Sequence, residues 1–325
     1  MAKEIKTIGV LTSGGDAPGM NAAVRAVVRT ALSKGIKVKG IERGYNGLLH
    51  TEMRDMDLRS VSEIIHRGGT VLYTARCLEF LTKEGQEQGA QCCRDNGIDA
   101  LVVIGGDGSF KGARALANLG IPCIGIPGTI DNDIACSEYT IGYDTAMNTA
   151  VEMVDKLRDT TQSHDRCSVV EVMGRHAGYI ALNVGIATGA IATLIPERPY
   201  DLERDILDRM SFTQKTGKKH FIIVKAEGVS GTAQDLANEI QARTGIDSRA
   251  TVLGHVQRGG APTLRDRVTA SQMGYQAVYL LERGIFNRVV AVSADQIVDY
   301  DINVALAMHK TIDTKMIDVA NTISI

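Results

Sequence analysis

The feature that most constrains the fold of this chain is a regular alternation of short apolar runs with helical patterns. The runs are continuously apolar, and continuous runs of this kind predict parallel strands buried on both faces. One intervening segment, residues 144–159, carries its apolar residues on a single helical stripe. The sequence therefore predicts an α/β fold of Rossmann-like three-layer domains with mostly parallel sheets. The nine expected strands are 8–11, 38–41, 100–104, 123–126, 169–172, 193–195, 221–224, 251–253 and 289–292.

Length and charge exclude several classes of protein. A chain of 325 residues is long enough for two domains. With 36 Lys and Arg against 38 Asp and Glu, the net charge is −2, so we expect no nucleic-acid partner and no membrane partner. The longest uncharged stretch, 177–196, contains several glycines and polar residues, which favours a buried helix and strand over a membrane span.

The cysteines and histidines indicate neither a disulfide framework nor a zinc site. Six cysteines occur without a CxxC pair, and the seven histidines form no HExxH motif. The N-terminal residues lack the pattern of a secretory signal. We therefore expect reduced thiols and a cytoplasmic protein.

Two glycine-rich turns follow expected strands and lead into expected helices. They are TSGGDAPGMN (12–21) and GGDGS (105–109). Glycines let the backbone approach phosphate oxygens, and the first amides of the following helix are free to donate to them. Asp107 adds a carboxylate where Mg²⁺ bound to a nucleotide needs an oxygen ligand. Each turn alone is equally consistent with a plain strand–helix connection, capped in the second turn by Asp107 or Ser109.

A third turn, PGTIDND (127–133), places two carboxylates at the end of another strand. Of Asp131 and Asp133, one is suited to take a proton from an attacking hydroxyl, and the other to orient that hydroxyl or assist the metal. An Asx-turn in a polar loop explains the same residues without any catalysis.

Two further runs supply arginine and histidine. They are MGRHAG (173–178) and RATVLGHVQRGG (249–260). Arginine and histidine spaced along a strand and its exit loop favour a site for a doubly charged phosphate monoester. A single arginine, such as the isolated Arg76 or Arg166, is more often a solvated surface cation.

Together these motifs resemble ATP-dependent 6-phosphofructokinase of the short bacterial type. The matching blocks, in order, are 12–25, 105–109, 127–133, 173–178 and 249–267, and the resemblance extends from about residue 8 to about residue 298. It implies phosphorylation of fructose 6-phosphate at its 1-hydroxyl by ATP, giving fructose 1,6-bisphosphate in glycolysis, with Mg²⁺ as cofactor.

The resemblance also implies roles for single residues near the transferred phosphoryl group. Asp131 matches the general base, and Thr129 and Asp133 match residues that position the hydroxyl and the phosphoryl group. Arg76 and Arg175 match arginines near that group, where loss of a cation is expected to cost on the order of 10³ in rate. Matches to ATP-binding positions, with Asp107 as the Mg²⁺ carboxylate and Tyr45 beside the adenine, are Gly15, Tyr45, Arg76, Cys77, Gly106, Asp107, Gly108 and Ser109.

A second set of positions matches the sugar-phosphate site of the family. His255 and Arg258 match the grip of the same subunit on the 6-phosphate, and Glu227 matches the acceptor for a sugar hydroxyl. Arg166 and Arg249 match the grip contributed by a neighbouring subunit, so the resemblance implies an oligomer, typically a homotetramer. The full set of matched positions is Thr129, Ile130, Asp131, Arg166, Met173, Gly174, Arg175, Glu227, Arg249, His255, Val256, Gln257 and Arg258.

The phosphoryl donor is argued from two glycines. Pyrophosphate-using relatives typically carry Asp in place of Gly108 and Lys in place of Gly128. Glycine at both positions leaves room for a nucleotide, which favours ATP. The alternatives are a pyrophosphate-dependent phosphofructokinase, another sugar or NAD kinase sharing GGDG, and a catalytically silent metabolite sensor.

A regulatory nucleotide site is common in the short bacterial enzymes, and this chain departs from it. Leu58 and Thr216 stand where arginine is usual, and Ile191 stands where a metal-binding Glu is usual. Because each charge-assisted contact contributes roughly 1.5–3 kcal/mol, we expect weak or absent regulation by ADP and phosphoenolpyruvate. The expected cations that are present are Arg25, Arg29, Arg158, Lys218 and Lys219.

Composition shows no linker, so the resemblance alone suggests domain boundaries. It assigns residues 1–139 and 252–301 to an ATP-binding domain, and residues 140–251 and 302–325 to a sugar-phosphate-binding domain.

Overall fold

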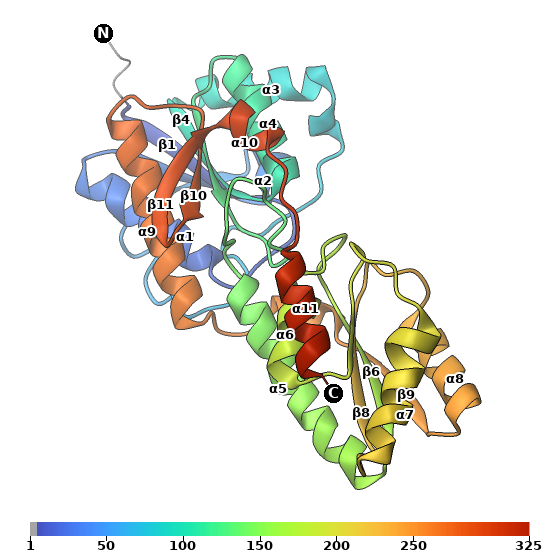
Figure 1. The fold of residues 1–325 in the computed structure, drawn as a ribbon. Coiled ribbons are helices and arrows are strands. Elements are labelled where there is room, and N and C mark those ends of the chain that lie inside the picture. Colours follow the sequence, from blue (N-terminus) through green and yellow to red (C-terminus); the bar gives the residue numbers. More distant parts are fainter. Residues whose placement is uncertain (1–4, 325) are drawn as a thin grey trace. The chain divides into compact units, whose positions relative to one another are not determined.

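The computed structural model describes residues 5–324 and divides the chain into two compact units (Figure 1). Unit 1 comprises the described part of Met1–Thr145 together with Arg258–Lys310. Unit 2 comprises Ala146–Gln257 and the described part of Thr311–Ile325. The chain thus leaves one unit for the other after Thr145, after Gln257 and after Lys310.

Unit 1 contains a seven-stranded sheet whose five inner strands are parallel, in the order β11-β10-β5-β4-β1-β2-β3. The edge strands β3 and β11 are antiparallel to their neighbours and largely unburied, which is why a search for apolar runs does not find them. The bounds are β1 Thr7–Thr12, β2 Lys37–Ile41, β3 Met53–Met56, β4 Ala100–Gly105, β5 Cys123–Pro127, β10 Arg288–Ser293 and β11 Gln296–Asp301.

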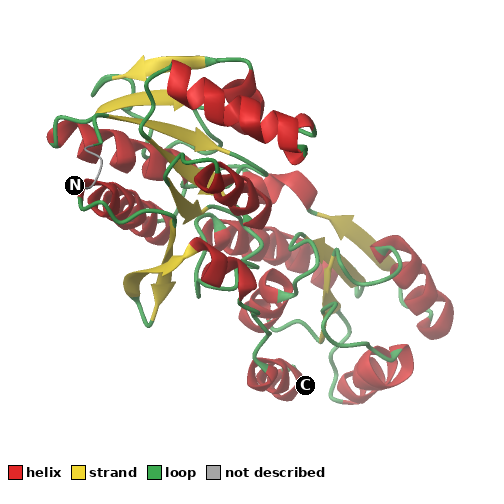
Figure 2. Cartoon of the chain, turned by 90° about the horizontal axis from the view of Figure 1, so that it is seen from above, coloured by secondary structure: helices red, strands yellow, loops and turns green. Residues whose placement is uncertain are grey.

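Helices cover both faces of this sheet, as the layers of Figure 2 show. One face packs against α2, α3, α4 and α10 through a buried cluster that includes Leu101, Val103 and Phe110. The other carries α1 and α9, which pack closely because Gly274 lies against the backbone of α1. Their bounds are α1 Met20–Ser33, α2 Gly44–Leu49, α3 Lys83–Asp95, α4 Asp107–Asn118, α9 Leu264–Glu282 and α10 Ile302–Ala307, with a 3₁₀ turn at Glu79–Leu81.

Unit 2 contains a four-stranded parallel sheet in the order β7-β8-β6-β9. The uncharged stretch 177–196 forms α6 and β7, as expected. The strands are β6 Cys167–Val172, β7 Ala192–Leu194, β8 Phe221–Ala226 and β9 Ser248–Val252. The helices are α5 Tyr143–Ser163, α6 Tyr179–Thr188, α7 Asp208–Lys215, α8 Ala233–Thr244 and α11 Thr314–Ile323, with a π-helical turn at Glu203–Leu207 and a 3₁₀ turn at Gly254–Arg258.

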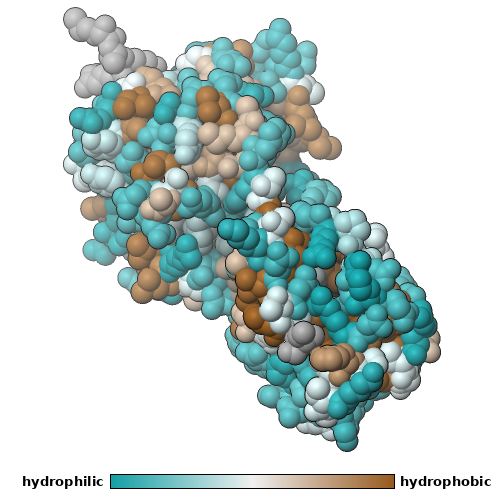
Figure 3. All heavy atoms as spheres, viewed as in Figure 1, coloured by the Kyte–Doolittle hydropathy of each residue, from teal (hydrophilic) through white to brown (hydrophobic). Residues whose placement is uncertain are grey.

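The predicted α/β class with mostly parallel sheets is confirmed, and two strand boundaries need correction. The run 251–253 is only the end of a strand that begins at Ser248, and Leu253 lies beyond it. The run 193–195 is displaced by one residue from β7. None of the helices formed by residues 5–324 is long and apolar enough to cross a membrane. On the face shown in Figure 3, hydrophobic residues occur in small separate groups among hydrophilic ones.

The buried carboxylate of Asp266 fixes the segment that leads out of unit 1 at Thr145. Asp266, on α9, is fully buried and accepts hydrogen bonds from the amides of Gly142 (2.7 Å) and Thr145 (2.9 Å). The hydroxyls of Tyr139 and Thr145 donate to it as well. Burial nevertheless raises the pKa of Asp266, so these donors compensate only part of the desolvation.

Candidate active site

The three glycine-rich turns of unit 1 lie side by side at one edge of its sheet. They follow β1, β4 and β5, which are adjacent parallel strands. The amide of Ser13 donates to the carbonyl of Ile104 (2.9 Å), and that of Gly128 donates to the carbonyl of Gly105 (3.0 Å). The structure therefore gathers three motifs, separated in sequence, at the carboxyl ends of the strands, where α/β folds bind ligands.

Three glycines of these turns differ in how closely their surroundings would crowd a side chain. A Cβ on Gly105 would lie 2.4 Å from the carbonyl oxygen of Ser13, so glycine here lets two turns touch. A Cβ on Gly108 would meet no atom within 4 Å, so packing does not require glycine there. At Gly128 a Cβ would lie 3.1 Å from both Ile104 and Met20. Tight packing thus also favours glycine at position 128, so the argument about the phosphoryl donor depends mainly on Gly108.

Asp107 is the first residue of α4, and it is exposed beside the open space at Gly108. Across residues 5–324, no cluster of three or more His, Cys, Asp or Glu side chains could hold a metal ion. Mg²⁺ in nucleotide sites uses one or two carboxylates together with phosphate oxygens. Asp107 therefore fits a metal ion that arrives with a phosphorylated ligand.

The loop after β5 holds its carboxylate in a nearly closed environment. Asp131 is 6% exposed and Thr129 is 8% exposed. The amide of Asp131 donates to Thr129 Oγ1 (3.2 Å), and Thr140 Oγ1 donates to the Thr129 carbonyl (2.7 Å). Asn132 follows with a left-handed φ of 52°, an uncommon conformation for a residue with a side chain. Ile130 is fully buried, and Asp133 is half-buried.

Tyr45 has a structural role in the core of unit 1. Its ring stacks on Phe80 with centroids 4.1 Å apart, and its hydroxyl donates to the carbonyl of Ser109 (2.5 Å). The side chain is only 6% exposed, and burial raises its pKa. Tyr45 thus supports the GGDGS turn through its hydrogen bond to Ser109. Its placement beside an adenine stays a prediction. Arg76 is exposed and Cys77 half-buried in the loop before the Glu79–Leu81 turn.

In unit 2 two side chains fix the turn that follows β6. Glu227, directly after β8, accepts the amides of Gly174 (3.1 Å) and Arg175 (2.6 Å) on one oxygen. Gln257 is fully buried, and its Oε1 accepts the amide of Met173 (2.8 Å). Within the described residues no hydrogen-bond partner is present for Gln257 Nε2. Arg175 has a left-handed φ of 58° and is exposed.

Arg166 and Arg249 lie at the opposite end of the same sheet. They precede or begin β6 and β9, whereas Met173 and Glu227 follow the carboxyl ends of their strands. Because a strand rises roughly 3.3 Å per residue, Arg166 and Met173 are about 20 Å apart. Asp247 pairs with both arginines, at 2.6 Å from Arg166 Nε and 3.0 Å from Arg249 Nε. Sequence reasoning missed Asp247, because no motif marks it.

The run 249–260 is divided between the two units after Gln257, and its role as a phosphate site stays a prediction. Arg249 lies near the amino end of β9, and His255 and Val256 are exposed beyond its carboxyl end. Arg258 belongs to unit 1, where its Nη1 donates to the Asp16 carbonyl (3.0 Å). A Cβ on Gly15 would lie 2.6 Å from that guanidinium, so glycine allows Arg258 to lie against the first turn.

The cations expected at a regulatory site form two groups. In unit 1, Arg25 and Arg29 lie on α1, and the pKa of Arg25 is lowered by burial and by Arg29. In unit 2, burial lowers the pKa values of Lys218 and of His220, and Arg158 lowers both further. His220 lies beside these cations, which disfavour its own protonation, and it was missed from the sequence.

The three departures from the regulatory pattern have different surroundings. Lys219 is exposed beside the unit 2 group, and Thr216 directly follows α7. Leu58 is 53% exposed in unit 1, whereas Ile191 is fully buried in unit 2.

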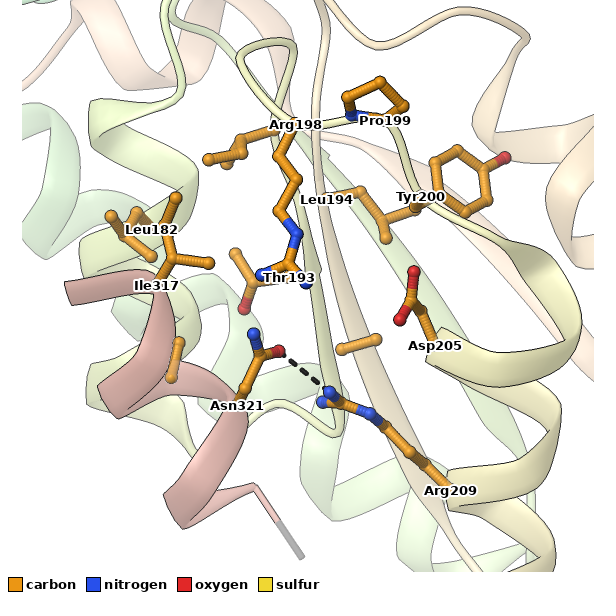
Figure 4. A pocket seen from close by; sticks show the side chains of 13 residues that line it. Leu182, Thr193, Leu194, Arg198, Pro199, Tyr200, Asp205, Arg209, Ile317 and Asn321 are labelled. Atoms are coloured by element: carbon orange, nitrogen blue, oxygen red, sulfur yellow. Dashed lines mark hydrogen bonds between the residues drawn. The ribbon is translucent and has the colours of Figure 1, made fainter. Parts of the chain in front are cut away.

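Unit 2 has a further pocket, which contains none of the residues singled out from sequence (Figure 4). It lies beside α11, where Arg209 donates to Asn321 Oδ1 (2.9 Å), Ser324 Oγ (3.2 Å) and the carbonyl of Ile191 (3.3 Å). Arg209 thus fastens the C-terminal helix to the sheet. The pocket is lined mainly by apolar side chains such as Leu182, Leu194 and Ile317.

Comparison with known proteins gives a consistent family. A family model described as phosphofructokinase matches residues 7–281. Proteins named ATP-dependent 6-phosphofructokinase from Clostridium botulinum (strain Loch Maree / Type A3) and Clostridioides difficile (strain 630) are each 54% identical, covering 98% and 99% of this chain and 100% of their own length.

Solved structures of phosphofructokinases have the same fold as this chain. The phosphofructokinase of Saccharomyces cerevisiae superposes with a TM-score of 0.89 at 35% identity, over 98% of this chain and 48% of that chain. This chain therefore spans about half of the yeast one. A pyrophosphate-dependent phosphofructokinase from Marinobacter aquaeolei superposes with a TM-score of 0.86 at 25% identity, over 96% of this chain and 86% of that one.

Proposed function

We propose, from the premise that the chain belongs to the phosphofructokinase family, that it transfers the γ-phosphoryl group of ATP to the 1-hydroxyl of fructose 6-phosphate. The observation that carries this proposal is the arrangement of three glycine-rich turns on adjacent strands of unit 1, with Asp107 on the second turn and Asp131 on the third. The relatives at 54% identity are named for the same reaction.

Unit 1 supplies the nucleotide side and the base. Amides of the turns at Gly15 and Gly106–Ser109 donate to phosphate oxygens, and the open space at Gly108 leaves room for the donor. Asp107 would hold Mg²⁺, and the bound ion would neutralise charge that develops on the phosphates. Asp131 accepts the proton of the 1-hydroxyl, and Thr129 and Asp133 orient that hydroxyl. Arg76 offers an exposed guanidinium for charge on the transferred group.

ATP is favoured over pyrophosphate as the donor. An Asp at position 108 would bring a negative charge into the space that the α-phosphate needs, and glycine keeps that space open. The relatives at 54% identity are named ATP-dependent, whereas the pyrophosphate-dependent enzyme is 25% identical.

Unit 2 supplies the sugar-phosphate side. Glu227 fixes the turn at Met173 and Gly174 for the sugar, Arg175 presents an exposed cation, and His255 is exposed as well. Arg166 lies about 20 Å along the sheet from that turn, and Arg249, level with Ser168, lies about 16 Å from it, which is too far for either to reach a sugar bound at that turn. Another copy must therefore provide them for the 6-phosphate, which supports a homo-oligomer, with a homotetramer as the expected form. Unit 1 is thus the ATP-binding domain and unit 2 the sugar-phosphate-binding domain.

The cysteines support a reducing cellular compartment for the enzyme. All six thiols are free, and burial raises the pKa values of Cys93 and Cys167 to about 12. Buried neutral thiols without disulfides suit a reducing compartment, so we place the enzyme in the cytoplasm.

Steady-state kinetics test the proposal. With Mg-ATP the enzyme is expected to convert fructose 6-phosphate to the 1,6-bisphosphate, and with pyrophosphate at least about 100-fold more slowly. Equal rates with both donors, or no product with either, would contradict it. Phosphoenolpyruvate added to the same titration is expected to shift the fructose 6-phosphate curve less than twofold, because Ile191 and Leu58 offer no charge to an effector.

A further inference from the structure

The loop that carries Asp131 is held by a lysine from a distant part of the chain. Lys310 Nζ donates to the carbonyl of Asn132 (2.8 Å) and to the carbonyl of Ser137 (2.7 Å), 178 and 173 residues away in sequence. Asn132 is 4% exposed and Ser137 is 2% exposed. One ammonium group therefore joins the beginning and the end of the buried segment that directly follows Asp131.

This segment cannot hold its shape through secondary structure, because it lies between β5 and α5. Asn132 has a left-handed φ, which turns the peptide after Asp131 out of any strand or helix ladder. Asn132 Nδ2 donates to the carbonyl of Glu138 (3.2 Å), and Ser137 Oγ to that of Tyr139 (2.6 Å). The carbonyls of Asn132 and Ser137 accept hydrogen bonds from the ammonium of Lys310. Hydrogen bonds to charged groups are about twice as strong as those between neutral groups.

Lys310 keeps its charge at neutral pH although burial opposes it. Burial lowers its pKa to about 8, and Asp133, Cys136 and Glu138 act in the opposite direction. Burial also raises the pKa of Cys136 to about 11, so this thiol stays neutral beside the ammonium. At pH 7 Lys310 is thus mostly protonated and donates to both carbonyls.

We propose that Lys310 is a positioning residue for phosphoryl transfer, which fixes the Asp131 carboxylate by joining the carbonyls of Asn132 and Ser137. The inference rests on the proposed role of Asp131 as the base. A base misplaced by about 1 Å loses on the order of 10² in rate, whereas substrates bound by the glycine turns and by unit 2 keep their contacts. The effect should therefore fall on kcat.

A purely structural lysine would give a different result. Its loss would lower stability, while the folded fraction would keep its kcat. The matched control is Lys34→Met, the same chemical change at an ammonium that pairs with Glu282 (3.0 Å) at the end of α1. Lys310→Arg keeps a cation with several donors at the site, and Lys310→Gln keeps only a neutral donor.

The experiment compares wild type, Lys310→Met, Lys310→Gln, Lys310→Arg and Lys34→Met at pH 7 with Mg-ATP and fructose 6-phosphate. Lys310→Met is expected to lower kcat about 10- to 100-fold, with both KM values within about threefold. Lys310→Arg is expected to recover at least fivefold of that loss, and Lys34→Met to stay within twofold of wild type. Thermal unfolding confirms that each assayed variant is folded.

A folded Lys310→Met variant with wild-type kcat, or a loss confined to KM, would overturn the inference. If Lys310→Met does not fold, Lys310→Gln decides in the same way, with an expected kcat loss of at least fivefold. These results are distinct from failure of the proposed function, which would show as wild type that does not phosphorylate fructose 6-phosphate.

Discussion

The proposed base of unit 1 and the proposed phosphate-binding arginines of unit 2 are held in contrasting ways. Asp131 lies in a nearly buried loop whose carbonyls are tied to Lys310 and Thr140. Arg166 and Arg249 are partly exposed, and both pair with the same carboxylate, Asp247. In the proposed reaction the base is therefore positioned before substrate arrives, whereas the arginines pair with a carboxylate that the incoming phosphate group would displace.

This difference predicts how each group contributes to the reaction. Groups that are fixed in advance act on the transition state and affect kcat. Groups that exchange one anion for another act on substrate binding and affect KM. Substitutions on the two sides should therefore separate into two kinetic classes.

The largest effect is expected from Asp131→Asn. The amide keeps the size of the side chain but cannot accept the proton of the 1-hydroxyl, so kcat should fall about 10²- to 10⁴-fold. Both KM values should stay within a few-fold, because the amide leaves the glycine turns and unit 2 unchanged. Steady-state kinetics measure both parameters. A loss that appears mainly in the KM for fructose 6-phosphate would remove the distinction between the two groups.

Arg249→Ala tests the exchangeable side. Its side chain is 68% exposed and does not support the core, so folding should be unaffected. A charge-assisted bond to the 6-phosphate contributes roughly 1.5–3 kcal/mol, so the KM for fructose 6-phosphate should rise about 10- to 100-fold with kcat nearly unchanged. Asp247→Asn, which removes the competing anion, should lower that KM. If Asp247→Asn raises the KM instead, Asp247 orients the arginines and the idea of exchange is wrong.

Gly108→Asp tests whether the open space in unit 1 is reserved for ATP. A Cβ at this position meets no atom within 4 Å, so we expect little change in stability, but the added charge should raise the KM for ATP at least about tenfold. Gly108→Ala is the control, since it adds volume without charge and should stay within about threefold. Unchanged ATP affinity in Gly108→Asp would leave the donor unexplained by this position.

Sequence alone was sufficient to predict features that depend on neighbouring residues, namely the parallel strands and the glycine turns. The parallel strands are predictable because burial on both faces requires continuous apolar runs, and the glycine turns are recognisable because each follows such a run. The edge strands β3 and β11 are not, because half-exposed antiparallel strands carry mixed residues. Lys310 and Asp247 lie outside any motif, and their partners are fixed only by tertiary structure.

The smallest expected effect concerns the pH dependence of stability, and it sharpens the contrast between the two sides. Lys310 is a base whose pKa falls from an ordinary 10.5 to about 8 in the folded chain. The unfolded chain therefore binds more protons between these values, so the Lys310 contribution to stability rises with pH and is lost as pH falls through 8. From pH 7 to 9 the free energy of unfolding of wild type should rise by about 1 kcal/mol relative to Lys310→Met. Denaturant unfolding at both pH values measures this difference. If the free energy of unfolding fell with pH instead, the folded loop would stabilise the ammonium of Lys310 more than burial opposes it. The loop that carries Asp131 would then depend on that charge more strongly than the geometry indicates.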